Sequence, residues 1–124
     1  QGLEREPTSP DLEHALGLSL VRQKRLDAAT AALSRAAALA PENARYSYVY
    51  AVALQSDGKL DQAIEALEDS HNRHPGDLDT LVALATFHRD AGRPQEALAH
   101  ARKLQKLMPD DPSVDQLVQQ LGAP

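Results

Sequence analysis

Four prolines divide this chain at a constant interval. Pro7, Pro41, Pro75 and Pro109 are each separated from the next by 34 residues. A fixed period of this length indicates stacked supersecondary units, each too small to bury its apolar face alone. The chain is therefore expected to fold as a repeat array.

Small and large apolar residues recur in register when the chain is aligned on this period. The units then run over residues 10–43, 44–77 and 78–111. The small residues form two columns, which are Gly17, Ala51 and Ala85, and Ala29, Ala63 and Ala97. Within each half-unit the apolar positions recur every three or four residues, which is the period of an amphipathic helix. The helices predicted from this pattern are 10–22, 26–39, 44–56, 60–73, 78–90, 94–107 and 112–121.

Residues that end and begin helices agree with this division. Gly58 and Gly92 stand where the first helix of their units must end, and Lys24 occupies the matching position of the first unit. Residues able to cap a helix follow three of the prolines by two positions, and they are Asn43, Asp77 and Asp111. Each unit is therefore predicted to be a helix-turn-helix.

The composition favours helices and excludes several classes of protein. Hydrophobic residues make up 42% of the chain but aromatic residues only 3%, so Ala and Leu must build the core. The net charge is −5, and 13 basic residues are interleaved with 18 acidic ones, which argues against nucleic-acid binding. Without cysteine, disulfides and thiolate sites are excluded. The longest aliphatic stretches, 36–40 and 81–87, are too short for membrane insertion. The absence of cysteine does not choose between the cytoplasm and the periplasm.

The repeat unit resembles the tetratricopeptide repeat (TPR). The stretches "GKLDQAIEAL" (58–67) and "GRPQEALAHARKL" (92–104) are similar to the turn and second helix of that family. The resemblance covers 10–111, and residues 112–124 are similar to the family's capping helix with a short tail. It implies an all-α solenoid, a right-handed superhelix of three repeats and a cap.

Pro7 lies on the same 34-residue lattice, and the chain begins with Gln instead of Met. Residues 1–9 are therefore expected to be a linker or the tail of a preceding repeat. On this interpretation Leu12, Leu16 and Leu20 would pack partly against that repeat, so their outer surfaces are expected to be exposed here.

Known catalytic and metal-binding motifs are not found in the sequence. The five histidines are His14, His71, His74, His88 and His100. Only His71 and His74 share a helix face at close spacing, and we interpret them as a solvated helix C-terminus, where histidine suits the helix dipole. His88 replaces an apolar residue of its column and is expected to be a hydrogen-bonded core residue. We expect no catalytic residue, cofactor or metal, and no enzyme activity.

The resemblance also implies where a partner would bind. In the family, the first helix of each unit lines a concave groove that binds protein segments. Carried over by register, the groove residues are Asp11, His14, Leu18, Arg22, Arg45, Tyr48, Val52, Gln55, Asp79, Val82, Thr86 and Arg89, with Gln116 from the cap. An apolar centre with charges nearer its edges indicates a protein partner. The alternative is that the same residues pack between adjacent units.

One ligand class of the family does not fit. Members that bind acidic chaperone tails use basic and amide side chains, whereas the matching positions here are His14, Leu18, Val49, Asp79 and Ala83. The leading interpretation is a scaffold that binds a protein or peptide with apolar anchors, such as an amphipathic helix. Two alternatives stay open. One is an accessory domain of a larger bacterial periplasmic redox or cytochrome-maturation protein, and the other is a self-association module that forms a homo-oligomer.

Overall fold

A computed structural model describes residues 9–122 of the chain, and this part contains seven helices and no strand. The helices are α1 (Pro10–Arg22), α2 (Leu26–Leu39), α3 (Ala44–Ser56), α4 (Leu60–Arg73), α5 (Leu78–Asp90), α6 (Pro94–Leu107) and α7 (Pro112–Gly122). The predicted bounds agree with these, except that α7 extends one residue further. The tail predicted over residues 1–9 lies outside the described residues, apart from residue 9.

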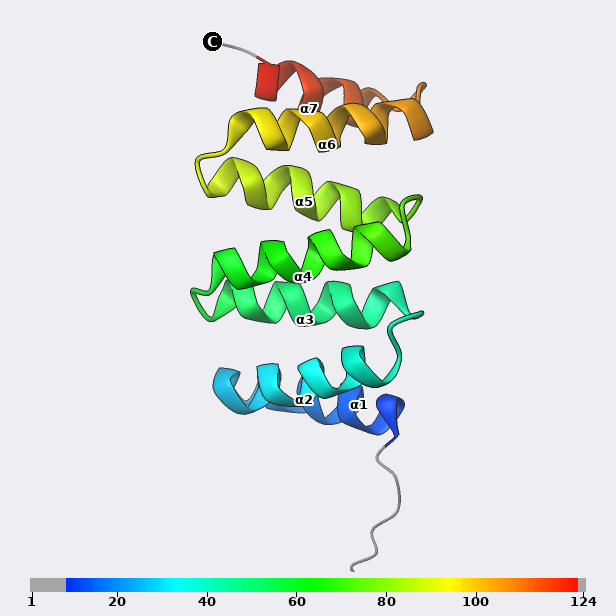
Figure 1. The fold of residues 1–124 in the computed structure, drawn as a ribbon. Coiled ribbons are helices and arrows are strands. Elements are labelled where there is room, and N and C mark those ends of the chain that lie inside the picture. The colour runs from blue at the N-terminus through cyan, green and yellow to red at the C-terminus, as the bar shows by residue number, and fades with distance from the viewer. Residues whose placement is uncertain (1–8, 123–124) are drawn as a thin grey trace, which may run out of the picture.

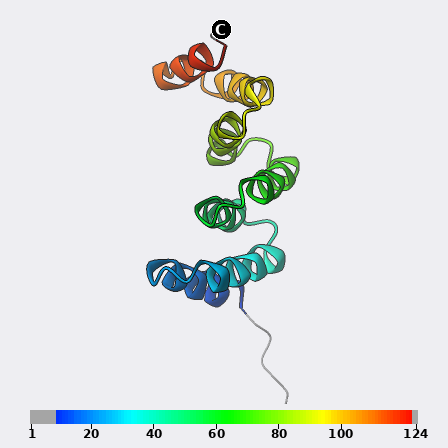
Figure 2. The ribbon, with the colours of Figure 1, turned by 90° about the vertical axis from the view of Figure 1, so that its left-hand side faces the viewer.

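The helices stack in the order of the sequence (Figure 1). Each helix packs against its neighbours in the chain, and α3 also contacts α5. Seen from the side, α1, α3, α5 and α7 form one layer, while α2, α4 and α6 form the other (Figure 2). The predicted all-α solenoid is confirmed.

Side-chain caps begin all four helices of the first layer. Asn43 accepts hydrogen bonds from two backbone amides in the first turn of α3, and Asp77 accepts one from the first turn of α5 at 3.0 Å. Asp111 accepts from the backbone amide of Ser113 at the start of α7, at 2.9 Å. These caps satisfy amides that lack partners within the helix, as predicted. Ser9 caps α1 in the same way, although no cap was predicted there.

The turns inside the helix pairs have a left-handed residue. Gly58 and Gly92 both have φ of 77°, a conformation that glycine adopts without steric cost. Lys24 takes the same place between α1 and α2 with φ of 60°. The repeat therefore imposes the same turn on a residue whose side chain disfavours it.

The predicted small-residue columns lie at the tightest contacts. Ala29, Ala51, Ala63, Ala85 and Ala97 are all 0% exposed. A Cβ atom at Gly17 would lie 2.5 Å from the side chain of Leu33, so α1 and α2 approach too closely for a larger residue. The columns thus set the spacing between paired helices.

The expectation for the first helix is partly wrong. Leu12 and Leu16 are 70% and 47% exposed, as expected for an outer surface of α1. Leu20 is only 7% exposed, because it packs against Ala29 and Ala32 of α2. Its position on α1 faces the paired helix and not a preceding unit.

Candidate functional site

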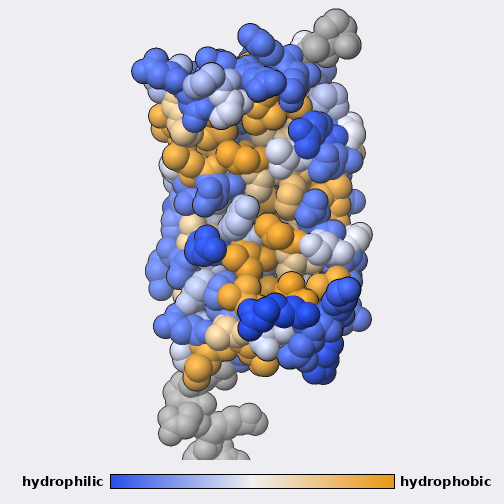
Figure 3. Space-filling model, turned by 180° about the vertical axis from the view of Figure 1, so that it is seen from behind, coloured by the Kyte–Doolittle hydropathy of each residue, from blue (hydrophilic) through white to orange (hydrophobic). Residues whose placement is uncertain are grey.

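The residues predicted to line the groove belong to α1, α3 and α5, which share one layer of the solenoid. Figure 3 shows the molecule from that side, where apolar side chains gather over the middle and hydrophilic residues lie along much of the border. Leu18 and Val82 are 36% and 42% exposed. The charged residues of the predicted set are all exposed, and they are Asp11, Arg22, Arg45, Asp79 and Arg89. An apolar surface bordered by charges therefore exists on this layer.

Two residues of the predicted apolar centre also take part in packing between helices. Tyr48 and Val52 are half-buried and pack against the central core cluster, which includes Leu84 and Phe87 of α5. Part of each side chain is thus covered by this cluster, and only the remainder is exposed. Packing inside the solenoid therefore accounts for part of each side chain, and the groove interpretation stays a prediction.

The polar residues of the middle of the face are only partly accessible. Gln55 and Thr86 are half-buried, and the Thr86 hydroxyl donates to carbonyl oxygens of its own helix, 3.1 Å from Val82 and 3.2 Å from Ala83. A hydroxyl already paired within its helix contributes little direct recognition. The exposed aliphatic groups are the stronger feature of this surface.

At the N-terminal end of this layer, an aromatic residue joins α1 to α3. The Tyr46 hydroxyl donates a hydrogen bond to Asp11, and the His14 ring stacks on Tyr46 with centroids 4.3 Å apart. Burial lowers the pKa of His14, and the nearby charge of Arg45 adds to this, while Asp11 opposes it. The hydrogen bond to Asp11 raises the pKa of Tyr46. Sequence reasoning missed Tyr46, although an aromatic residue in the first turn of α3 was a usable signal.

At the C-terminal end, a hollow of about 320 Å³ lies between α5, α6 and α7. Its apolar wall is formed by Val82, Leu104, Val114 and Leu117. Its polar lining consists of Ser113, Gln116 and Gln120. A recess of this size lies at the lower end of the range for ligand pockets and suits an apolar side chain. The sequence predicted Val82 and Gln116 here, but not the apolar face of α7.

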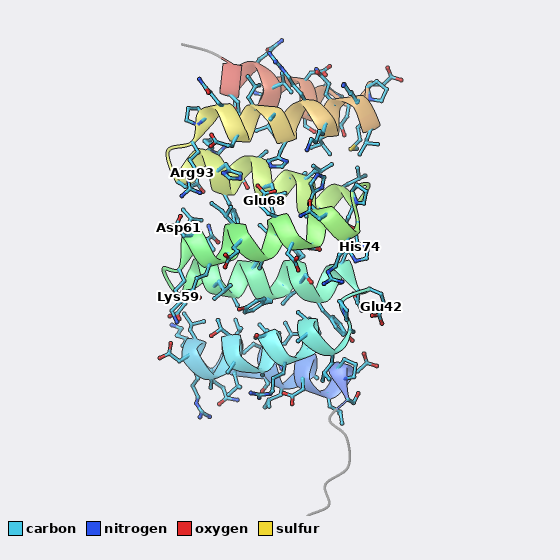
Figure 4. The ribbon with its side chains drawn as sticks, in the orientation of Figure 1. Glu42, Lys59, Asp61, Glu68, His74 and Arg93 are labelled. Carbon is cyan, nitrogen blue, oxygen red and sulfur yellow. The ribbon has the colours of Figure 1, made fainter. Side chains whose placement is uncertain are left out.

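A cluster of one glutamate and two histidines lies between α4, α5 and α6, away from the predicted groove. Glu68 extends from α4 toward the two following helices (Figure 4). Its Oε2 atom lies 2.9 Å from His88 Nε2 and 3.2 Å from His100 Nε2. His88 is 5% exposed, so the prediction of a hydrogen-bonded core histidine is confirmed. The clustering with His100 was not predicted, because the residues lie far apart in sequence.

The prediction of a solvated histidine pair at the end of α4 is wrong. His71 is 8% exposed, because α6 covers it, with the ring edge of His100 at a centroid distance of 5.5 Å. Lys103 Nζ lies 3.4 Å from His71 Nε2. His74 is half-buried, and its Nε2 lies 2.9 Å from the carbonyl oxygen of Pro41 in the preceding turn. Both histidines thus join α4 to neighbouring segments.

Burial and mutual contacts shift the protonation equilibria of this cluster. Partial burial acts to raise the pKa of Glu68, but the hydrogen bonds from His88 and His100 and the attraction of these rings when protonated outweigh it and hold that pKa below its usual value. Burial lowers the pKa of His100, although Glu68 acts in the opposite direction. Burial and the charge of Lys103 lower the pKa of His71. The directions favour an ionised Glu68 and neutral rings at His71 and His100.

Two tetratricopeptide repeat models match the chain, one over residues 14–77 and one over residues 54–121. The chain belongs to the tetratricopeptide repeat family. This confirms the resemblance, and membership makes the chain a protein–protein interaction scaffold. The bounds of the single repeats at 10–43, 44–77 and 78–111 stay a prediction, because the two matched ranges overlap without separating them.

Solved structures with the same fold include both bacterial and plant proteins. MamA AMB-1 is 22% identical, with a TM-score of 0.77, and the match covers 98% of this chain and 66% of that chain. The chain thus spans about two thirds of the length of that protein. The chaperone SycD of Yersinia enterocolitica is 16% identical, with a TM-score of 0.77, and was solved in complex with a peptide of the translocator YopD. That match covers 94% of this chain and 96% of the SycD chain. The TPR domain of Arabidopsis OM64 is 18% identical, with a TM-score of 0.75, and the match covers 91% of this chain and 93% of that chain. These likenesses show the fold.

No curated protein matches the sequence significantly. In the described part of the chain, every helix falls short of the length and apolarity needed to cross a membrane.

Proposed function

We propose that this TPR chain is a non-catalytic scaffold that binds a protein segment through apolar anchors on the face of α1, α3, α5 and α7. The observation that carries the proposal is the exposure of Leu18 and Val82 on one layer, at 36% and 42%, within a surface bordered by charges. Exposed aliphatic groups surrounded by polar ones are typical of protein-binding surfaces.

The hollow beside Val82 supports a short segment as the ligand. Its volume of about 320 Å³ accommodates a single large apolar side chain. The amide groups of Gln116 and Gln120 line it and can pair with the backbone of a bound segment. The related fold of SycD was solved with a peptide of its partner, which also supports a peptide ligand.

The charges along the surface argue against an acidic peptide. Asp79 is exposed on α5 three residues before Val82, so a carboxylate-rich tail would meet a like charge. Arg45 and Arg89 are exposed on neighbouring helices and suit a ligand of mixed or neutral charge. An amphipathic helix with aliphatic anchors fits these features.

A second candidate function is self-association through the outer face of α1. Leu12 and Leu16 are 70% and 47% exposed and lie one turn apart on that helix. Light scattering at several concentrations tests it. A dimer that Leu12→Glu dissociates favours self-association through α1, whereas a monomer at all concentrations excludes it.

The proposed groove is tested with peptides selected from a phage-displayed library on the purified chain. Fluorescence anisotropy then gives the Kd of a selected peptide for each variant. Val82→Glu is expected to weaken binding by about tenfold or more, because it places an unpaired charge in a desolvated contact. Circular dichroism verifies that the variant stays helical.

Ala99→Glu is the matched control, because it adds the same charge at an exposed position of α6, in the other layer. It is expected to leave the Kd unchanged. If Ala99→Glu abolishes peptide binding while Val82→Glu binds as the wild type does, the proposal has the wrong face.

A further inference from the structure

Three potential metal ligands converge inside the described part of the chain. Glu68 of α4, His88 of α5 and His100 of α6 each direct one ligand atom to the same place, and these atoms lie within 4.8 Å of one another. The side chains of His88 and His100 are 6% and 9% exposed, and that of Glu68 is 39% exposed. The group is thus interior, with one ligand that reaches the surface.

The repeat register shows that stacking does not require histidine at these positions. His88 occupies the column in which the preceding units have Leu20 and Leu54, both buried in the core. His100 stands two repeat lengths after Ala32, which is fully buried. Apolar residues fill the equivalent contacts elsewhere in the chain. The polar group is therefore an addition to the repeat and not part of its packing pattern.

Hydrogen bonding alone leaves this group incompletely satisfied. A single oxygen of Glu68 is shared by the Nε2 atoms of His88 and His100. The Nδ1 atoms of His88, His100 and the adjacent His71 are buried without a hydrogen-bond partner. Each of the His88 and His100 rings therefore uses only Nε2, and these two nitrogens converge on the single Glu68 oxygen.

Two of the three distances between ligand atoms are close to those of a tetrahedral metal site. The Oε2–Nε2 distances are 2.9 and 3.2 Å. Zinc bonds of about 2.0–2.1 Å place neighbouring ligand atoms about 3.3 Å apart, which these two distances approach, and the ligand atoms of the two histidines lie within 4.8 Å of each other. Two imidazoles and one carboxylate are also a donor set that zinc accepts, with a fourth position left for water.

We propose that Glu68, His88 and His100 bind a Zn²⁺ ion that joins α4 to α5 and α6. The carboxylate neutralises part of the charge of the ion, and both imidazoles coordinate through Nε2. Partial exposure of Glu68 gives the ion a route from solvent. Because the three ligands come from three helices, the bound ion fastens successive segments of the solenoid and stabilises the folded chain.

Isothermal titration calorimetry, in which zinc chloride is added to the chelator-treated chain, tests the site. We expect one ion per chain and a melting temperature that rises when zinc is added. Glu68→Gln and His100→Gln are each expected to weaken binding by about tenfold or more. Glu68→Gln is the more useful variant, because Glu68 is partly exposed and the substitution preserves its shape.

The matched control removes His14 and His74 together by substitution with alanine. Both are half-buried histidines outside the cluster, so the double variant shows whether zinc binds to histidine elsewhere on the chain. The double variant is expected to bind zinc as the wild type does. Binding that is lost in the double variant but kept in Glu68→Gln would overturn the proposal, as would the absence of binding to the wild type.

Cobalt substitution gives a second test that needs no variant. Co²⁺ in a tetrahedral site with nitrogen and oxygen ligands has intense visible absorption bands, whereas the hydrated octahedral ion absorbs weakly. We expect the wild-type chain to give the tetrahedral spectrum and zinc to abolish it by displacement. A spectrum of hydrated cobalt throughout the titration would overturn the site.

Discussion

Arg93 Nη2 lies 2.8 Å from Asp61 Oδ1, and this ion pair repeats one found earlier in the solenoid. Lys59 Nζ lies 3.8 Å from Asp27 Oδ1, and both residues precede their counterparts by 34 positions. In each pair, the basic residue directly before the second helix of one unit contacts an aspartate of the preceding unit. That aspartate lies in the first turn of the preceding unit's second helix. Figure 4 labels Lys59, Asp61 and Arg93 along this edge. Stacking is thus regular at the turns.

The Asp61–Arg93 pair is expected to contribute little to stability. The two side chains are 80% and 40% exposed, so water and salt screen their attraction. Asp61→Asn should lower the free energy of unfolding by less than about 1 kcal/mol, and high salt should remove the difference. Urea denaturation at low and high ionic strength measures this. A larger, salt-independent loss would show that Asp61 has another structural role.

Lys24→Gly is expected to stabilise the chain by about 1 kcal/mol, because glycine avoids the steric cost of the left-handed conformation. The φ of 60° at Lys24 is close to the 77° at Gly58 and Gly92. Gly58→Ala is the reverse experiment, since a Cβ atom there would have no neighbour within 4 Å and only backbone strain changes. It should destabilise by a similar amount in urea denaturation. Equal stability of all three proteins would mean that this turn relaxes without cost.

Ala63→Leu is expected to destabilise the fold by about 1–3 kcal/mol through overpacking. Ala63 is fully buried in the central core cluster, where the paired helices α3 and α4 approach each other. Ala99→Leu adds the same atoms at an exposed position of α6 and serves as the control. Thermal denaturation compares the two variants. If both melt as the wild type does, the small-residue column does not limit the helix spacing.

The elements that sequence predicted well depend on local chemistry. Helix ends follow from residues such as Asn43, Asp77 and Gly92, whose capping and turn geometries involve only a few neighbouring positions. The 34-residue period then orders these elements without any knowledge of long-range contacts. The helix bounds and the solenoid were therefore predictable together.

The errors concern surfaces that become covered when helices stack. The spacing of His71 and His74 on one helix face predicted that His71 is solvated, yet α6 covers it. Leu20 was expected to have an exposed outer surface, yet its paired helix covers it. Glu68 meets His88 and His100 across 20 and 32 residues, so no short spacing reveals the cluster. Val52 lies on the predicted face but is shared with the core. Which part of a helix surface is covered depends on the rotation of each helix, which periodicity does not fix.

Acidification is expected to destabilise the contact between α1 and α3 through His14. Its Nδ1 is buried without a partner, its ring stacks on Tyr46, and burial together with Arg45 lowers its pKa, against the opposing influence of Asp11. The unfolded chain therefore takes up the proton first as the pH falls through about 6.5. Stability attributable to His14 is unaffected above that pH and declines below it, until the folded form is protonated too.

His14→Gln removes this proton uptake and isolates the effect. Urea denaturation measures the free energy of unfolding of wild type and variant at a series of pH values from about 8 to 5. This range includes the usual pKa of histidine, about 6.5. The difference between the two proteins should be constant at the alkaline end and should shift in favour of the variant as the pH falls. Since the same carboxylates titrate in both proteins, their contributions cancel in the difference. A shift in favour of the wild type would mean that the Asp11 carboxylate, and not burial, controls the protonation of His14.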